Sequence, residues 1–396
     1  MSKKSPQLRF EGFTDDWEER KLGDYVIIRS GWSPSNFDIN NNANNLFIKV
    51  DDLNYSTRVQ KESQVKVNIL SKYKKMKKSS TIFPKRGAAI MTNKVRMLGE
   101  DSYMDTNMMA LEPKGIDPEY LYTFINKTRL YKIADTSTIP QINNKHIEPY
   151  LLLIPSLEEQ HKIGSFFKQL DGTIALHQRK LDLLKEQKKG YLQKMFPKNG
   201  EKVPELRFAG FADDWEQRKL NEVSDIYDGT HQTPKYQDNG VMFLSVENIK
   251  TLTSNKFISR EAFEDEFKIR PQRGDVLMTR IGDIGTANVV ETDEDLAYYV
   301  SLALFKSEEL NPYFLQASIY APFVQDQIWK RTLHIAFPKK INKNEIGQVP
   351  INVPTLAEQT KIGSFFKQLD NTITLHQRKL DLLKEQKKGF LQKMFV

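Results

Sequence analysis

Residues 157–196 read LEEQHKIGSFFKQLDGTIALHQRKLDLLKEQKKGYLQKMF, and residues 356–395 read LAEQTKIGSFFKQLDNTITLHQRKLDLLKEQKKGFLQKMF. The two stretches are identical at 35 of 40 positions. A second repeat precedes each of them: PQLRFEGFTDDWEERKL at 6–22 and PELRFAGFADDWEQRKL at 204–220, with 13 of 17 positions identical. The offsets are 199 and 198 residues, about half of the 396-residue chain. One unit is therefore written twice, which decides how the rest of the sequence is interpreted.

The forty-residue repeat has the pattern of a long amphipathic helix. Its apolar residues are spaced alternately three and four apart, as in a coiled coil, and a helix with such a stripe needs a partner. The second copy is the obvious partner. The predicted seam consists of Phe167, Leu170, Ile174, Leu181, Leu184, Tyr191 and Met195 in the first copy, and of Phe366, Leu369, Ile373, Leu380, Leu383, Phe390 and Met394 in the second.

Other residues of this repeat support the same interpretation. Ser156 with Glu159, and Thr355 with Glu358, fit an N-terminal capping box. The histidines on the seam, His177 and His376, are better explained as packed side chains than as metal ligands. Further apolar residues lie off the seam, which predicts that other faces of the helix are buried or bind other subunits. These residues are Phe166, Leu176, Leu183 and Leu192.

The segments between the repeats, roughly 23–150 and 221–350, are largely unlike each other. A shared frame with divergent inserts indicates a scaffold that presents two recognition surfaces. Short apolar runs bounded by turn residues predict strands in both inserts. These runs are 24–28, 46–50 and 88–91 in the first insert, and 241–246, 275–279 and 287–290 in the second.

Each insert then contains one amphipathic helix with the same start signal. Asp117-Pro118 precedes residues 119–133, and Asn311-Pro312 precedes residues 313–330. Asp or Asn as the N-cap, with Pro in the first turn, is a strong helix start. We therefore predict that the two inserts share one α/β architecture beneath divergent sequences.

Composition limits the class of protein. The chain contains no cysteine, which excludes disulfides and thiolate metal sites. Its opening residues are polar and no run of eighteen apolar residues occurs, so we expect a cytoplasmic protein without a membrane span. The net charge is +8, and residues 177–196 and 376–395 contribute +4 each. The rest of the chain is thus formally neutral in sum, so any nucleic-acid-binding surface on the inserts must be locally polarised.

Polar loops supply candidate DNA contacts. The loops at 137–149 and 332–346 are rich in amide, hydroxyl and cationic groups, which read base edges and hold phosphates. A lysine run at 72–80 and the loops at 229–237 and 278–285 have similar chemistry, although a solvated face or a plain turn would also explain them. The candidate DNA-binding residues are Lys72, Lys74, Lys75, Lys77, Lys78, Asn93, Lys94, Gln141, Asn143, Asn144, Lys145, Thr230, His231, Gln232, Thr233, Lys235, Tyr236, Arg280, Lys339 and Lys340.

Catalytic signatures are missing from the sequence. There is no GxGxxG and no GxxxxGK[ST], and the six histidines show no metal-ligand spacing. NPYF at 311–314 is similar to a methyltransferase loop, but it opens a helix and no glycine-rich strand precedes it. Asp15 and Asp16 fit the cap of a helix-like turn better than a metal site. We therefore expect no catalytic residue and no metal in this chain.

The repeated motifs resemble the specificity subunit of type I restriction–modification systems. LRFxGFxDDWExRKL, EQxKIGSFFKQLD and LDLLKEQKKGxLQKMF each occur twice, and the resemblance covers essentially the whole chain. It implies an α+β fold, in which two long antiparallel coiled-coil helices separate two pseudo-twofold-related target-recognition domains. The implied segments are 1–155 and 201–353 for the domains, with 156–200 and 354–396 for the spacer helices.

The resemblance also implies a function. Such a chain would recognise an asymmetric bipartite target in double-stranded DNA and would be the non-catalytic subunit of a DNA adenine methyltransferase and ATP-dependent endonuclease. Two modification subunits and restriction (translocase) subunits would be its partners. They would use S-adenosylmethionine, ATP and Mg, with no cofactor in this chain. The alternatives are a protein-interaction scaffold that does not bind DNA, and an orphan nuclease or methyltransferase with an unrecognised site.

Overall fold

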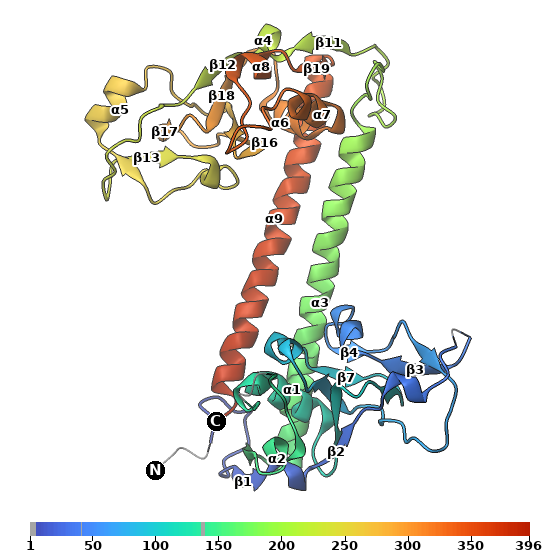
Figure 1. The fold of residues 1–396 in the computed structure, drawn as a ribbon. Coiled ribbons are helices and arrows are strands. Elements are labelled where there is room, and N and C mark those ends of the chain that lie inside the picture. The colour runs from blue at the N-terminus through green and yellow to red at the C-terminus, as the bar shows by residue number, and fades with distance from the viewer. Residues whose placement is uncertain (1–4, 41, 136–138) are drawn as a thin grey trace. The chain divides into compact units, whose positions relative to one another are not determined.

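The computed structural model of this protein describes residues 5–40, 42–135 and 139–396. The chain forms two compact units (Figure 1). Unit 1 consists of Met1–Arg179 with Arg378–Val396, and unit 2 consists of Lys180–Gln377. The division falls within both long helices, so each unit contains one insert, the first part of one long helix and the last part of the other. The four segments expected from the sequence stay a prediction.

The repeated forty residues form the helices α3 (Leu157–Lys194) and α9 (Leu356–Lys393), each of 38 residues. The predicted starts are half confirmed. The backbone N–H of Glu159 lies 3.4 Å from Ser156 Oγ, and that of Glu358 lies 3.4 Å from Thr355 Oγ1. The two glutamate side chains do not accept from the N-cap backbone N–H as a capping box requires. Each binds an arginine of the shorter repeated segment, at 6–22 or 204–220, instead.

Those arginines belong to the repeated segments at 6–22 and 204–220. Arg9 binds both carboxylate oxygens of Glu159, at 2.9 and 2.8 Å, and the indole of Trp17 donates to the same carboxylate at 3.2 Å. Arg207 holds Glu358 in the same way, at 2.7 and 2.8 Å. The prediction of a helix-like turn after Asp15 and Asp16 was wrong. The segment forms strands, because it pairs with the strand that precedes each long helix.

Among its described residues, unit 1 contains three sheets and two short α-helices besides the long ones. Its two-stranded sheet pairs β1 (Glu18–Lys21) with β10 (Leu151–Ile154). Its five-stranded sheet has the order β2 (Val26–Ser30), β9 (Met108–Pro113), β6 (Thr81–Pro84), β7 (Arg96–Leu98) and β4 (Val59–Gln60). Its three-stranded sheet has the order β5 (Lys66–Val67), β3 (Asn45–Ile48) and β8 (Tyr103–Met104). The helices are α1 (Pro118–Thr128) and α2 (Asn144–Ile147).

Unit 2 is built in the same order. Its two-stranded sheet pairs β11 (Glu216–Lys219) with β19 (Pro350–Val353). Its four-stranded sheet has the order β12 (Asp225–Asp228), β18 (Leu302–Lys306), β15 (Val276–Ile281) and β16 (Asp283–Val289). Its three-stranded sheet has the order β14 (Phe257–Ile258), β13 (Val241–Leu244) and β17 (Leu296–Tyr298). Its short helices are α4 (Leu220–Val223), α5 (Arg260–Glu266), α6 (Pro312–Tyr320), α7 (Pro322–Lys330) and α8 (Lys343–Gly347).

The predicted common architecture of the inserts is confirmed strand by strand. The order β2-β9-β6-β7 in unit 1 matches β12-β18-β15-β16 in unit 2. The pairs β3·β8 and β13·β17 are both parallel, whereas the neighbouring pairs β3·β5 and β13·β14 are antiparallel. Unit 1 adds β4 at a sheet edge, and unit 2 adds α5 and α7.

The helix starts in the inserts are confirmed, but the helices end earlier than predicted. Asp117 accepts a hydrogen bond from the Tyr120 N–H at 2.8 Å, and Asn311 caps α6 in the same way. Helix α1 ends at Thr128 because Arg129 adopts a left-handed conformation with φ of 56°. The second helix is broken into α6 and α7 because Pro322 forces the residue before it into an extended conformation.

Five of the six predicted strands overlap observed ones, namely β2, β3, β13, β15 and β16. The strand expected at 88–91 was wrong: Ala88–Thr92 is a 3₁₀ helix. Gly87 and Asn93, at its two ends, have φ of 73° and 48°, and such left-handed residues close a turn rather than extend a chain. The apolar run was read as a strand because periodicity cannot assign so short a segment.

The long helices pack antiparallel inside each unit, as expected (Figure 1). In unit 1, Phe166 near the start of α3 meets Phe390 near the end of α9, with ring centroids 5.0 Å apart. In unit 2, Tyr191 near the end of α3 meets Phe365 near the start of α9 at 4.9 Å. All fourteen predicted seam residues, and both seam histidines, are buried or half-buried.

The expectation that the off-seam residues are buried holds for only part of the set. Phe166 and Leu192 are half-buried. Leu176 and Leu183 are 65% and 52% exposed, and their counterparts in α9, Leu375 and Leu382, are 64% and 52% exposed. The chain therefore does not cover this pair of leucines in either helix. Among the described helices, none is long and apolar enough to cross a membrane.

Candidate nucleic-acid interface

Three of the predicted DNA-contacting loops in unit 2 meet at one buried side chain, Arg280 at the end of β15. Its guanidinium forms an ion pair with Asp228, the last residue before the loop at 229–237. Its Nε donates to the carbonyl oxygen of Ile341, within the loop at 332–346, at 3.1 Å. Arg280 itself lies in the third loop, 278–285, and is only 6% exposed. We call this cluster of Arg280, Asp228 and Ile341 the unit 2 junction.

Unit 1 has a matching junction around Lys85, a residue absent from the sequence prediction. Lys85 follows β6 as Arg280 ends β15, and it is 9% exposed. Its ammonium donates to Ser30 Oγ at 2.7 Å, and its carbonyl oxygen accepts from the Ile142 N–H at 2.8 Å. Burial lowers the pKa of Lys85. The junction joins the end of β2 to the predicted loop at 137–149, of which Ser137 and Thr138 lie outside the described residues.

A sequence signal for Lys85 was present in the comparison of the two inserts. Lys85 and Arg280 are each followed two residues later by a glycine with positive φ, Gly87 at 73° and Gly282 at 81°. Each glycine N–H donates to the opposite loop at 2.8 Å, to the carbonyl oxygens of Pro140 and Lys339. A cation, any residue and then glycine, at the end of the same core strand, therefore marks both junctions.

The lysine run of unit 1, residues 72–80, lies in an irregular segment. Some of its lysines bind other side chains of the unit, and others are open to solvent. Lys77 forms an ion pair with Asp101 at 2.8 Å, and this hydrogen bond raises the pKa of Lys77. Lys75 is half-buried and donates to Asn45 Oδ1. Lys72, Lys74 and Lys78 are exposed. Lys72, Lys74 and Lys78 are therefore the members of the run whose charge is most open to a phosphate, since Lys77 is exposed but paired with Asp101.

The other predicted contacts of unit 1 lie in two places. Asn93 donates to the carbonyl oxygen of Asn126 at 2.9 Å and accepts from the Leu130 N–H at 3.2 Å, so its amide holds the turn after α1. Lys94 donates to Asn54 Oδ1. The second place is the start of α2, within the predicted loop at 137–149, which contains Gln141, Asn143, Asn144 and Lys145. Gln141 donates to Asn143 Oδ1 at 2.9 Å, and Lys145 pairs with Asp135 at 3.6 Å.

In unit 2 the predicted residues beyond Arg280 lie on the surface. Thr230 begins its loop in a backbone bridge to Tyr299. The predicted residues of this loop that are exposed are His231, Gln232, Thr233, Lys235 and Tyr236. Lys339 and Lys340 are also exposed, and the ammonium of Lys339 lies 4.8 Å from the ring centroid of Trp329. The structure thus brings these loops to one junction, and base contact by any single residue stays a prediction.

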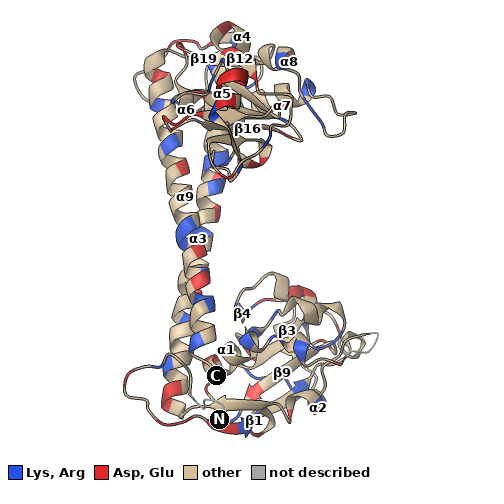
Figure 2. Cartoon of the chain, turned by 90° about the vertical axis from the view of Figure 1, so that its left-hand side faces the viewer, with Lys and Arg blue, Asp and Glu red and all other residues tan. Residues whose placement is uncertain are grey.

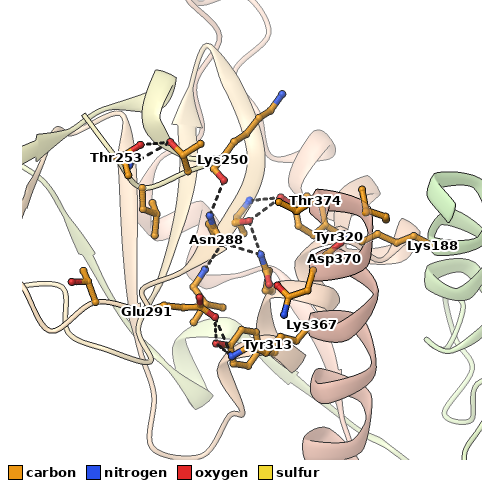
Figure 3. Close-up of a pocket in the computed structure, with 18 of the residues that line it drawn as sticks. Lys188, Lys250, Thr253, Asn288, Glu291, Tyr313, Tyr320, Lys367, Asp370 and Thr374 are labelled. Carbon is orange, nitrogen blue, oxygen red and sulfur yellow. Dashed lines mark hydrogen bonds and ion pairs between the residues drawn. The ribbon is translucent and has the colours of Figure 1, made fainter. Parts of the chain in front are cut away.

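Unit 2 also contains a polar pocket of about 640 Å³ beside α9 (Figure 3). Lys367 forms an ion pair with Glu291 at 3.0 Å, and both groups meet the hydroxyl of Tyr313. The hydrogen bonds from Tyr313 and Lys367 lower the pKa of Glu291. On the other side, Asp370 pairs with Lys188 at 2.6 Å.

The same place in unit 1 is filled by an arginine of the insert. Asp171, the counterpart of Asp370 in the helix repeat, pairs with Lys387 at 2.7 Å and also with Arg58. Arg58 pairs with Glu119 as well, and its guanidinium lies 4.2 Å from the ring centroid of Tyr122. The Asp171 side chain is accordingly 12% exposed, against 34% for Asp370. The same aspartate of the helix repeat is therefore paired with an insert arginine in unit 1, as Asp171, and lines an open pocket in unit 2, as Asp370.

Within the described ranges, no group of three or more histidine and carboxylate side chains is arranged to hold a metal ion. The two junctions and their loops instead present amides, hydroxyls and cations. These are the groups that proteins use to contact phosphates and base edges.

Comparison with known proteins agrees with this geometry. Residues 14–186 and 212–385 both match the family described as "Type I restriction modification DNA specificity domain". The chain belongs to the type I restriction–modification DNA specificity family. As a specificity subunit, it provides DNA sequence specificity through two target-recognition domains and is not the catalytic component. The predicted fold class and non-catalytic role are thus confirmed by family membership.

Individual relatives cover most of this specificity subunit. It is 24% identical to the type I restriction enzyme MjaVIII specificity subunit of Methanocaldococcus jannaschii, over 95% of this chain and 91% of that protein. A putative MjaX specificity subunit of the same organism is 23% identical over 72% of this chain and 69% of that protein.

Solved structures show the same fold. A specificity (S) subunit from M. genitalium matches with a TM-score of 0.68 and 13% identity, and the match covers 99% of both chains. A structure described as addressing complex assembly and conformational transition of the type I R-M system matches with a TM-score of 0.53 and 16% identity, over 96% of this chain and 97% of that one.

Proposed function

We propose that this specificity subunit recognises an asymmetric DNA target in two parts, with unit 1 reading one part and unit 2 the other. The observation that carries the proposal is the pair of junctions. Both sit at the end of the same core strand, but one is built on Lys85 and Ser30 and the other on Arg280 and Asp228. Identical scaffolds with chemically different loops are suited to reading different sequences.

The long helices support the second half of the proposal, that the two parts are separated by unread base pairs. A helix of 38 residues is about 57 Å long, whereas one turn of DNA is roughly 34–36 Å. A spacer helix of this length exceeds one turn of DNA, which leaves room for unread base pairs between two half-sites. The base pairs between them would stay unread because no loop would reach them.

We further propose that the partners are two modification subunits and restriction (translocase) subunits. The support is the pair of uncovered leucines that the repeat places in each helix, Leu176 with Leu183 and Leu375 with Leu382. Residues of both charges, Lys and Arg as well as Asp and Glu, occur along α3 and α9 (Figure 2). Two identical surfaces fit two copies of one partner. The partners would use S-adenosylmethionine, ATP and Mg, this chain would hold no cofactor, and the complex would act in the cytoplasm.

The test is a sequence-resolved map of methylated adenines in DNA from cells that express this chain together with its modification subunits. The proposal predicts one motif with two different short parts and an unspecified gap between them. The matched control is the same cells with the modification subunits alone, which should leave no such motif. A palindromic or uninterrupted motif would contradict the two-reader arrangement. DNA binding that does not depend on this chain would favour the protein-scaffold alternative.

A further inference from the structure

The loop at residues 333–340 of unit 2 is a closed, anchored turn, which we call the tip loop. The Leu333 N–H donates to the Lys340 carbonyl oxygen at 2.8 Å and closes its base. The imidazole of His334 lies against the indole of Trp329 in a tilted arrangement, with ring centroids 4.1 Å apart, and its Nε2 donates to the Trp329 carbonyl oxygen at 2.9 Å. Lys339 covers the same indole from the other arm of the loop. The base of the loop is therefore fixed by several independent contacts.

The end of the tip loop presents two large apolar side chains to solvent. Ile335 is 99% exposed and Phe337 is 104% exposed. Single exposed apolar residues are ordinary on protein surfaces. Two fully exposed ones on an anchored loop are different, because the anchoring holds them away from the core that would otherwise bury them. The apolar surface of Ile335 and Phe337 becomes energetically favourable only when a binding partner covers it.

The charge around the tip identifies what would cover it. Between Asp326 and Glu345 the sequence contains no carboxylate, and its basic residues are Lys330, Arg331, His334, Lys339, Lys340 and Lys343. Lys330 is used by Asp326, at 2.6 Å, whereas Lys339 and Lys340 flank the tip on the surface. An apolar tip between cations complements a ligand with a negatively charged exterior and a flat apolar interior. Duplex DNA, with phosphates outside stacked bases, has this chemistry.

The tip loop is also part of the unit 2 junction. Arg280 donates to Ile341 directly after the loop, and the Gly282 N–H donates to the Lys339 carbonyl oxygen at 2.8 Å. The loop is thus held by the turn between β15 and β16 and by the same guanidinium that fixes the loop at 229–237. Whatever the junction reads, the tip is placed beside it.

We propose that Phe337, supported by Ile335, inserts between neighbouring base pairs of the half-site that unit 2 reads, while Lys339 and Lys340 bind the flanking phosphates. The inference rests on the proposed function and adds a mode of reading to it. Insertion of an apolar wedge unstacks one base step and favours steps that deform easily, such as TA and CA. Phe337 would therefore determine specificity partly through the deformability of the DNA.

The experiment uses the complete complex with its modification subunits and the duplex identified by methylation mapping. 2-Aminopurine is placed at one position at a time, and its fluorescence rises when its base step is unstacked. The wild type is expected to raise the fluorescence at one step in the half-site of unit 2. Phe337→Ala should abolish that rise and weaken specific binding on the order of 10-fold or more. Phe337→Trp should restore both.

A matched control keeps the readout specific. Ile269 is an exposed apolar residue of the same unit (41%) outside the reader loops, and Ile269→Ala should behave as the wild type does. Unchanged binding and fluorescence with Phe337→Ala would overturn the inference while leaving the two-reader function intact. Loss of modification subunits from the Phe337→Ala complex, with DNA affinity retained, would make the tip a protein-docking surface and also overturn it. A wild-type complex with no preferred sequence would overturn the proposed function and this inference together.

Discussion

One ion pair in each unit, Arg9–Glu159 and Arg207–Glu358, joins the short repeated segment to the start of the long helix. Glu159 and Glu358 have side chains that are 1% exposed, and each is neutralised by an arginine about 150 residues earlier in the chain. The hydrogen bond to the carboxylate raises the pKa of Arg9 and of Arg207. The sequence pattern indicated a capping role for the glutamates. A fully buried carboxylate needs a cation, and the arginine repeat supplies it.

The duplication allows one substitution to be compared in two contexts. Arg207→Met would leave the carboxylate of Glu358 buried without a cation, which is expected to destabilise unit 2 by about 3 kcal/mol or more. Arg9→Met should cost less, because the Trp17 indole still donates to Glu159 at 3.2 Å, whereas the Trp215 indole has no partner among the described atoms. Amide hydrogen exchange of β10 and β19 reports the two units separately. Equal losses of protection would contradict this account of the frame.

The carboxylate of Glu119 gives unit 1 a predictable response to acid. Burial alone would raise its pKa, but hydrogen bonds from Arg58 and Lys168 leave the pKa below its ordinary value. Because the folded pKa is the lower one, the ionised group stabilises unit 1 above roughly pH 4.3, and this contribution is lost as the pH falls through the folded pKa.

Glu119→Gln should therefore lower the stability of unit 1 at pH 7 by about 2 kcal/mol, on the usual strength of hydrogen bonds to charged groups. The difference from the wild type should shrink toward pH 3, because the carboxyl group of the unfolded chain takes up a proton below roughly pH 4.3. Urea unfolding at both pH values measures it. A difference that stays constant from pH 7 to pH 3 would show that the charge of Glu119 is not what stabilises the site.

Among secondary-structure elements, the long helices were predictable and the inserts only partly so. The apolar spacing of three and four residues continues through each 38-residue helix. This pattern specifies the helix and its buried stripe without reference to the rest of the chain. Strands of the inserts are two to seven residues long and pair across long separations, as β2 does with β9, so a local pattern cannot give their partners. The helix ends at Arg129 and Pro322 depend on one backbone conformation each, which the amphipathic pattern does not encode.

The candidate site shows the same division. The polar loops of unit 2 were identified from their composition, but Arg280 was assigned to DNA contact, and the structure places its guanidinium inside the junction. Lys85 was missed because a single lysine after a strand has no distinctive local pattern. Only the comparison of the two inserts, position by position, shows that it replaces Arg280. The tip at Ile335 and Phe337 was not predicted, because apolar letters in a loop do not reveal their exposure.

Adjacent leucines in α9 separate the roles of its two faces. Leu383 is 7% exposed in unit 1, and Leu382 beside it is 52% exposed. Leu383→Asp would bury an unpaired charge, so we expect it to destabilise the helix pair by several kcal/mol. Leu382→Asp should fold like the wild type but lose affinity for the modification subunits. Thermal unfolding and co-purification distinguish the two effects. Normal folding of Leu383→Asp would contradict the proposed seam.

For the whole molecule, the central claim is that one frame carries two independent readers. The frame accounts for the repeated residues: the arginine–glutamate pairs, the helix seams and the two-stranded sheets beside them. The inserts share strand order but differ in three features. These are the residues of their junctions, the tip loop of unit 2, and Arg58 of unit 1, which pairs with Asp171 of the long helix. Independence follows because each insert forms its junction with residues of its own unit.

The most direct test exchanges residues 221–350 for the corresponding insert of another family member and maps methylated adenines in the DNA. The account predicts that one half of the motif changes to that of the donor, while the other half stays as in the wild type. The matched exchange of residues 23–150 should change the opposite half. A motif in which both halves change after one exchange, or in which neither does, would contradict the claim of two independent readers.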